Sequence, residues 1–93
     1  MIRHIVMWKF REGTQHEQAR FMDALRALQG VIPELKSSEV AVNIGQDNYD
    51  AVLVAEFESM EALETYKNDP RHQAASALCK DIRTDRVAVD YEF

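Results

Sequence analysis

Cysteine, proline and glycine are scarce in this chain of 93 residues, which contains one, two and three of them, respectively. The single cysteine, Cys79, excludes an internal disulfide and favours a reducing, cytoplasmic compartment. No Cys and His residues have the spacing of a zinc site. No apolar run approaches the roughly 20 residues of a membrane span, and the N-terminal residues lack the apolar core of a signal peptide. We therefore expect a cytoplasmic protein without a metal or a membrane partner.

Basic residues are also few, because 11 Lys and Arg stand against 16 Asp and Glu, which gives a net charge of −5. They are scattered along the chain, so the basic stripe of a nucleic-acid-binding protein is missing. Hydrophobic residues make up 46% and charged residues 29% of the chain, which is typical of a folded globular protein. The length accommodates one hydrophobic core, and we predict a single domain over residues 1–93.

Alternation of apolar and polar residues predicts four strands. The first covers residues 2–10 and the third about 50–58, and both are apolar on two faces. The second strand, around 40–44, and the last, about 85–93, alternate more cleanly between apolar and polar residues. Strands one and three are therefore expected in the middle of the sheet.

Apolar residues at helical spacing predict one helix between the first two strands and a broken helix before the last strand. The first helix begins with a Thr-Gln-His-Glu capping box at Thr14 and ends at Gly30. The second begins after Ser59 and restarts at Asp69, with Pro70 at the first helical position. The order β-α-β-β-α-β is that of a ferredoxin-like α+β unit with a four-stranded antiparallel sheet.

The helices of such a unit cover only one face of its sheet. The other face carries six aliphatic residues: Ile5, Met7, Val52, Val54, Val87 and Val89. Leaving each of them exposed would forgo about 1.5–3 kcal/mol relative to full burial. We therefore predict a homodimer in which the sheets of two copies pack together. The alternative is a monomer with an exposed apolar face.

Two histidines and a tyrosine are the candidate site residues, because imidazole and phenol groups can perform acid/base chemistry without a metal. His72 is about the third residue of its helix, where the positive helix end favours the neutral imidazole that a general base requires. Its alternative role is to donate a hydrogen bond that seals the helix junction. Tyr66, one turn earlier, can hold His72 through its hydroxyl or fill the core with its ring.

His4 shares one side of the first strand with Val6 and Trp8. It can orient or protonate a ligand there, or it can be a buried neutral histidine bonded to a backbone carbonyl or to Tyr66. Arg86 is the best candidate for binding an anion, and its alternative is a solvated residue of an edge strand.

Four segments extend these observations over the whole chain. They are His4-Ile-Val-Met-Trp-Lys-Phe10, the stretch 49–59, Tyr66 with Asp69-Pro70-Arg-His72, and Val89-Asp90-Tyr91. In this order they resemble the stress-responsive A/B barrel (Dabb) family of the dimeric α/β-barrel superfamily. The resemblance implies a homodimer whose sheets form a joint β-barrel with the helices outside. It also implies a small-molecule pocket, in which plant polyketide cyclases of the olivetolic acid cyclase type work without a metal or a cofactor.

The resemblance further implies roles for single residues. His72 matches the catalytic base of the cyclases, His4 their second active-site histidine, and Tyr66 the tyrosine that helps to hold the base. The implied pocket lining consists of Val6, Trp8, Phe21, Met22, Leu53, Ala55, Leu63 and Ala88. Leu25 replaces a pocket tyrosine, and Arg86 stands where the cyclases are apolar. A smaller or anionic ligand therefore suits this chain better than a long alkyl-bearing polyketide.

The reaction is left open at this point. An enzyme of this kind would use cofactor-free acid/base chemistry beside a carbonyl, as a cyclase, an isomerase or a lyase. His72 would remove the proton, Tyr66 would orient His72, and His4 would polarise or protonate the ligand oxygen. One alternative is a non-catalytic stress or ligand-binding dimer. Another is a cofactor-free monooxygenase of the antibiotic-biosynthesis type, in which Trp8 would gain interest.

Overall fold

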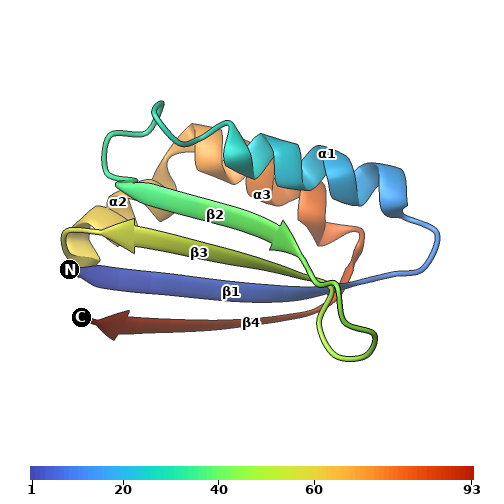
Figure 1. Cartoon of the computed structure of the whole chain (residues 1–93). Coiled ribbons are helices and arrows are strands. Elements are labelled where there is room, and N and C mark those ends of the chain that lie inside the picture. The colour runs from blue at the N-terminus through green and yellow to red at the C-terminus, as the bar shows by residue number, and fades with distance from the viewer.

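The structure, a computed structural model, describes residues 1–93 and places all three helices on one side of a single antiparallel sheet (Figure 1). The elements are β1 (Ile2–Phe10), α1 (Gln15–Arg26), β2 (Ser37–Val42), β3 (Ala51–Phe57), α2 (Met60–Asn68), α3 (Pro70–Lys80) and β4 (Arg83–Glu92). The strand order β2-β3-β1-β4 puts the first and third strands in the centre, as their apolar pattern predicts. The protein therefore has the ferredoxin-like α+β fold. No helix is long and apolar enough to cross a bilayer.

The pairing of the strands decides which side chains meet on the helix side of the sheet. β1 pairs antiparallel with β4, and this register sets His4 opposite Asp90, Val6 opposite Ala88 and Trp8 opposite Arg86. Side chains alternate between the two faces along each strand. The buried His4 and Trp8 point toward the helices, and their partners on β4 share that face.

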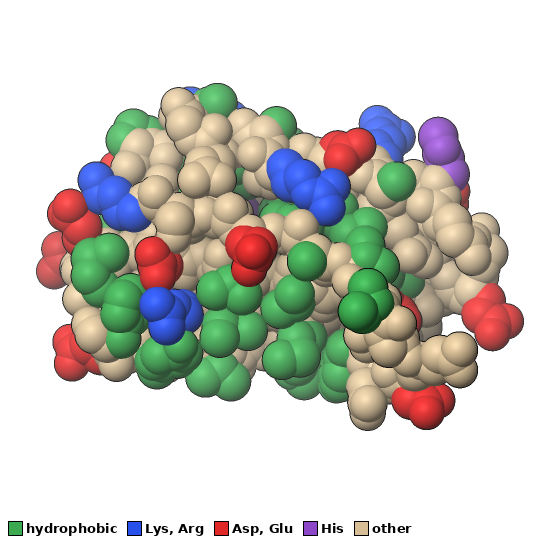
Figure 2. All heavy atoms as spheres, viewed as in Figure 1, with side chains coloured by type: hydrophobic (Ala, Val, Ile, Leu, Met, Phe, Trp, Pro, Cys, Tyr) green, Lys and Arg blue, Asp and Glu red, His purple; other side chains and the backbone are tan.

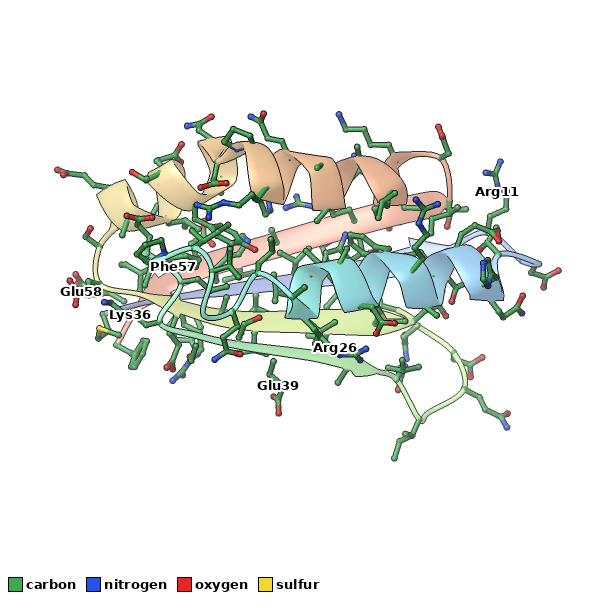
Figure 3. All side chains as sticks on the ribbon, turned by 90° about the horizontal axis from the view of Figure 1, so that it is seen from above. Arg11, Arg26, Lys36, Glu39, Phe57 and Glu58 are labelled. Atoms are coloured by element: carbon green, nitrogen blue, oxygen red, sulfur yellow. The ribbon has the colours of Figure 1, made fainter.

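The hydrophobic core lies between this sheet face and the helices and contains 20 buried residues. Phe21, Met22 and Leu25 of α1 are among them, as the helical spacing predicts. Phe57, labelled in Figure 3, is fully buried at the end of β3. Arg26 at the end of α1 lies beside β2 in the same view and donates a hydrogen bond to the carbonyl of Val40. This bond ties the edge strand to the helix layer.

One predicted cap and two predicted boundaries are wrong. Thr14 precedes α1, but its side chain caps no backbone N–H: its hydroxyl donates to the carbonyl of Arg11 and accepts from the Gln18 side chain. The helix ends at Arg26, about one turn before Gly30, and tight turns fill the interval. β2 ends at Val42, so Ile44 lies in the following loop and is fully exposed. Local turn bonds replaced the expected capping box and the last helical turn.

The break between α2 and α3 is formed as predicted. The Ser59 side chain accepts a hydrogen bond from the N–H of Ala62 and caps α2. Asp69 accepts one from the N–H of Arg71 and caps α3, which begins with Pro70. Because proline has no N–H to donate and Asp69 has extended backbone angles, the chain changes direction here.

The sheet face opposite the helices is apolar and uncovered. Met7, Val87 and Val89 are 40%, 42% and 60% exposed on this face, and the other three predicted aliphatic residues are half-buried. Figure 2 shows hydrophobic side chains gathered along the side of the molecule that carries no helix. The patch has the composition of an interface.

Candidate functional site

A small cavity lies between the sheet and the helices, on the helix side of β1. Its lining residues are His4, Val6, Trp8, Phe21, Leu25, Leu53, His72, Ser76 and Arg86. Its volume is about 40 Å³, which holds roughly three water molecules at about 10–15 Å³ of accessible volume each. The cavity therefore suits a small molecule or the reacting end of a larger one.

The cavity brings together most, but not all, of the predicted site residues. His4 and His72 both border it, and so do six of the predicted pocket residues, Val6, Trp8, Phe21, Leu25, Leu53 and Arg86. Five others lie outside it: Met22, Ala55, Leu63 and Tyr66 are buried in the core, and Ala88 is exposed on β4. Ser76 was not predicted, although it is one turn after His72 on α3 and therefore shares its face.

His4 is held by a carboxylate that the sequence analysis did not assign. Nδ1 of His4, a residue only 4% exposed, is bonded to Oδ1 of Asp90. A carboxylate can only accept, so Nδ1 carries the hydrogen and Nε2 of the neutral ring keeps its lone pair. The partner is thus neither a backbone carbonyl nor Tyr66. The antiparallel register of the first and last strands is the signal that could have identified Asp90.

His72 is fixed by the break between α2 and α3. Its Nδ1 lies 3.3 Å from the carbonyl oxygen of Lys67, which in an unbroken helix would accept from the N–H of Arg71. That N–H instead donates to Asp69, so the carbonyl is free to accept from His72. His72 therefore also carries its hydrogen on Nδ1 and leaves Nε2 unprotonated.

Tyr66 supports His72 with its ring. The two ring centroids are 4.3 Å apart at an angle of 47°, and the Tyr66 ring also contacts that of Phe57, at a centroid distance of 5.0 Å. The phenol hydroxyl makes no hydrogen bond within the chain, and no buried polar side-chain atom lacks a partner, so this hydroxyl reaches accessible space. Burial raises the pKa of Tyr66 to about 12. The hydroxyl therefore stays protonated at neutral pH.

Burial is the main cause that lowers the pKa of both histidines. For His4, the Asp90 carboxylate opposes this effect, because it favours a protonated ring. For His72, the charges of His4 and Arg86 add to it, and the Lys67 carbonyl opposes it. Both imidazoles are thus mainly neutral at pH 7. Asp69 favours the His72 cation weakly from a distance, whereas only His4 has a carboxylate bonded to its ring.

Other reactive groups are not brought to the cavity. Cys79 is buried in the core, and burial raises the pKa of its thiol. No three His, Cys, Asp or Glu side chains are grouped as metal ligands would be. Trp8 packs edge to face on Phe21, with centroids 5.1 Å apart, and forms part of the apolar wall.

The sequence and the fold are similar to those of known proteins. The family described as "Stress responsive A/B Barrel Domain" (Dabb) matches residues 2–93. An uncharacterised protein of Streptomyces coelicolor is 37% identical over 98 residues, covering the whole of both chains.

Solved structures of other proteins have the same fold. A dimeric ferredoxin-like protein of unknown function from Thermobifida fusca has a TM-score of 0.89 and 32% identity, over 99% of this chain and 90% of that one. The hydroxynitrile lyase of Passiflora edulis, with a TM-score of 0.85 and 18% identity over 97% and 90% of the two chains, shares the fold. The chain described here belongs to the stress-responsive A/B barrel (Dabb) domain family.

Proposed function

We propose that the protein is a homodimer that catalyses cofactor-free acid/base chemistry beside the carbonyl of a small molecule, as a cyclase, isomerase or lyase. One observation carries this proposal: two neutral imidazoles, each with Nδ1 occupied and Nε2 free, border the same cavity. Two free ring nitrogens in one hollow can act on two atoms of one ligand.

The surroundings of the two histidines suggest different roles. Burial and the charge of Arg86 disfavour the protonated form of His72, so this residue is suited to act as the base that removes a proton from carbon. His4 has Asp90 to stabilise its protonated form, so it suits the group that returns a proton to the ligand oxygen. Arg86, also at the cavity, suits the negative charge that develops on that oxygen. Tyr66 holds His72 in position through ring contact.

The lyase of Passiflora edulis supports the view that this fold accommodates chemistry at a small substrate. The cavity volume of about 40 Å³ also argues for a compact substrate rather than a long alkyl chain. The making or breaking of a C–C bond beside a carbonyl is therefore the first reaction to test.

The dimer is part of the proposal. Six aliphatic side chains of β1, β3 and β4 lie on the uncovered sheet face, and two similar structures, from Thermobifida fusca and Bacteroides fragilis, are described as dimeric. Covering such a face removes apolar area from water, which stabilises the complex by about 25 cal/mol for each Å² buried. A second copy offers the same apolar face in return, as a two-fold interface requires.

The test is exchange of carbon-bound hydrogen for deuterium, followed by proton NMR in D₂O with acetone, pyruvamide and pyruvate as probes. We expect the protein to accelerate exchange at the carbon beside the carbonyl. His72→Gln should remove most of this acceleration, since a positioned general base contributes about 10²–10⁴-fold. His16→Gln is the matched control, because His16 is exposed in α1 and far from the cavity lining. If His72→Gln and His16→Gln exchange at the same rate, His72 is not the base.

A non-catalytic ligand-binding dimer is the second candidate. The hydrogen bond of His72 to the Lys67 carbonyl favours it, because this bond closes the α2–α3 junction and would exist without any reaction. In that case His72→Gln lowers stability while no probe exchanges faster than in buffer. Trp8, the residue that the monooxygenase alternative singles out, packs on Phe21 as part of the cavity wall.

A further inference from the structure

A polar depression adjoins the cavity on its outer side. Five residues of α2 and α3 line it, Lys67, His72, Gln73, Ser76 and Lys80, and none of them is hydrophobic. His72 and Ser76 also border the inner cavity, so these two side chains form the wall between the two spaces. We call the outer space the basin. It is the polar approach to an otherwise apolar hollow.

The basin and the cavity are positive in a protein that is negative overall. The chain has 16 Asp and Glu against 11 Lys and Arg, yet no carboxylate lines either space. The basin contains Lys67 and Lys80, and the cavity contains Arg86. Of these cations only Lys67 has a partner, Glu64, at 3.7 Å and on the exposed helix surface. An exposed pair of this kind binds weakly and gives way to a ligand.

Arg86 is the cation that borders the cavity itself, and like Lys80 it has no side-chain partner. Three arginines of the chain are paired with carboxylates, Arg3 with Glu56, Arg26 with Asp23 and Arg71 with Asp69. Arg86 is one of those that are not. The guanidinium of Arg86 forms no ion pair or hydrogen bond within the chain, although it borders the cavity. Its five donors are arranged to bind a carboxylate through two parallel hydrogen bonds.

We propose that the ligand of this protein is a small carboxylate that enters from the basin, passes Ser76 and binds with its carboxylate on Arg86. This inference rests on the proposed function for the reaction, but not for the binding. The lysines of the basin attract the anion, and the short side chain of Ser76 forms the part of the wall that a small molecule can pass. A carboxylate held on Arg86 leaves the rest of the ligand between the two imidazoles.

The first test compares pyruvate with pyruvamide, its neutral counterpart of similar shape, in an NMR titration of the ¹⁵N-labelled protein. We expect pyruvate to bind more tightly than pyruvamide. Arg86→Gln should weaken the binding of pyruvate about 10–100-fold, because hydrogen bonds to charged groups are stronger than those between neutral groups. The same substitution should leave the affinity for pyruvamide nearly unchanged. Equal affinity for the two probes, no binding of pyruvate, or an unchanged preference in Arg86→Gln would overturn the proposal.

The second test concerns the route. Lys67→Gln with Lys80→Gln should slow the association of pyruvate and reduce its salt dependence. Lys36→Gln is the matched control, since Lys36 pairs with Glu58 at the far end of β3 (Figure 3). Ser76→Leu should also slow association, and Ser76→Ala should not. Equal association rates in all of these variants would refute entry from the basin.

Failure of this inference and failure of the proposed reaction have different signatures. If pyruvate binds no more tightly than pyruvamide and Arg86→Gln weakens the binding of neither, the ligand is not a carboxylate, and loss of exchange in His72→Gln would still identify His72 as the base. If pyruvate binds through Arg86 and His72→Gln leaves exchange unchanged, the carboxylate site stands without the proposed reaction.

Discussion

Tyr66 allows a sharp test of whether a ring or a hydroxyl positions the candidate base. The residue is 1% exposed and its ring contacts those of Phe57 and His72, whereas its hydroxyl makes no hydrogen bond within the chain. Tyr66→Phe removes only the hydroxyl. Tyr66→Leu removes the aromatic contacts and keeps an apolar residue in the core. The two substitutions therefore separate the two predicted roles of this residue.

The structure gives the expected size of each effect. Tyr66→Phe breaks no internal hydrogen bond, so the free energy of unfolding should change by less than about 0.5 kcal/mol. Tyr66→Leu loses two aromatic contacts at about 0.5–1.5 kcal/mol each and leaves a cavity, for a total of about 2–4 kcal/mol. In a domain of this size, that corresponds to a decrease in Tm of roughly 10–25 °C.

The assay is thermal and urea unfolding at one protein concentration, because a dimer's stability depends on concentration. Proton NMR of the His72 ring provides a second reading. Tyr66→Leu should raise the pKa of His72 toward its ordinary value, since it removes part of the burial that lowers it. Tyr66→Phe should leave that pKa in place. The reasoning is refuted if Tyr66→Phe destabilises the protein or shifts the pKa of His72 as much as Tyr66→Leu does.

Three further predictions follow from the sheet and the histidines. Val89→Asp places a charge on the uncovered face and should yield monomers, as measured by size-exclusion chromatography with light scattering. Val31→Asp, on an exposed turn, is the control and should leave the dimer intact. Equal masses of the two variants would contradict the sheet-to-sheet dimer. The folded-state pKa values of His4 and His72 lie below 6.5, so the unfolded chain binds more protons in acid. The contribution of the two histidines to the free energy of unfolding should be fully present above pH 6.5 and should be lost as the pH drops through their folded-state pKa values. A double His→Gln variant tested by urea unfolding should lose less stability over the same pH range. Asp90→Asn should lower the pKa of His4 further and free its tautomer, which ¹⁵N NMR of the ring would detect; an unchanged ring spectrum would show that Asp90 does not hold it.

The sequence was sufficient for the strand order and the face of each strand. Two-sided apolar character marked β1 and β3 as central, and alternation marked β2 and β4 as edges. These features depend on burial averaged over many residues, which a sequence pattern records well. The errors at the Thr14 cap and at the helix end near Gly30 have a different origin. There single hydrogen bonds decided between a cap and a turn, and such bonds leave little trace in composition.

The site was predictable in its residue types and less so in its contacts. His4 and His72 could be found because histidines are rare here and fall on apolar elements. Their partners could not be found in the same way. Asp90 is 86 positions from His4 and becomes its neighbour only through strand register. The Lys67 carbonyl becomes available only because a helix breaks at Pro70. Both contacts are consequences of the assembled fold.

The same two strands build the cavity and the proposed dimer surface, with alternate side chains. On β1, His4 faces the helices and Met7 faces the uncovered side; on β4, Asp90 and Val89 divide in the same way. β4 is an edge strand, and β1 is its only neighbour in the chain. Within one copy, β1 alone therefore pairs with the backbone of β4 and holds Asp90 in register with His4, and the Tyr49 hydroxyl adds a side-chain bond to Asp85. A second copy packed on Val89 would restrain β4 from the other side, so the partner would stabilise the bond that orients His4 without contributing a residue to the cavity.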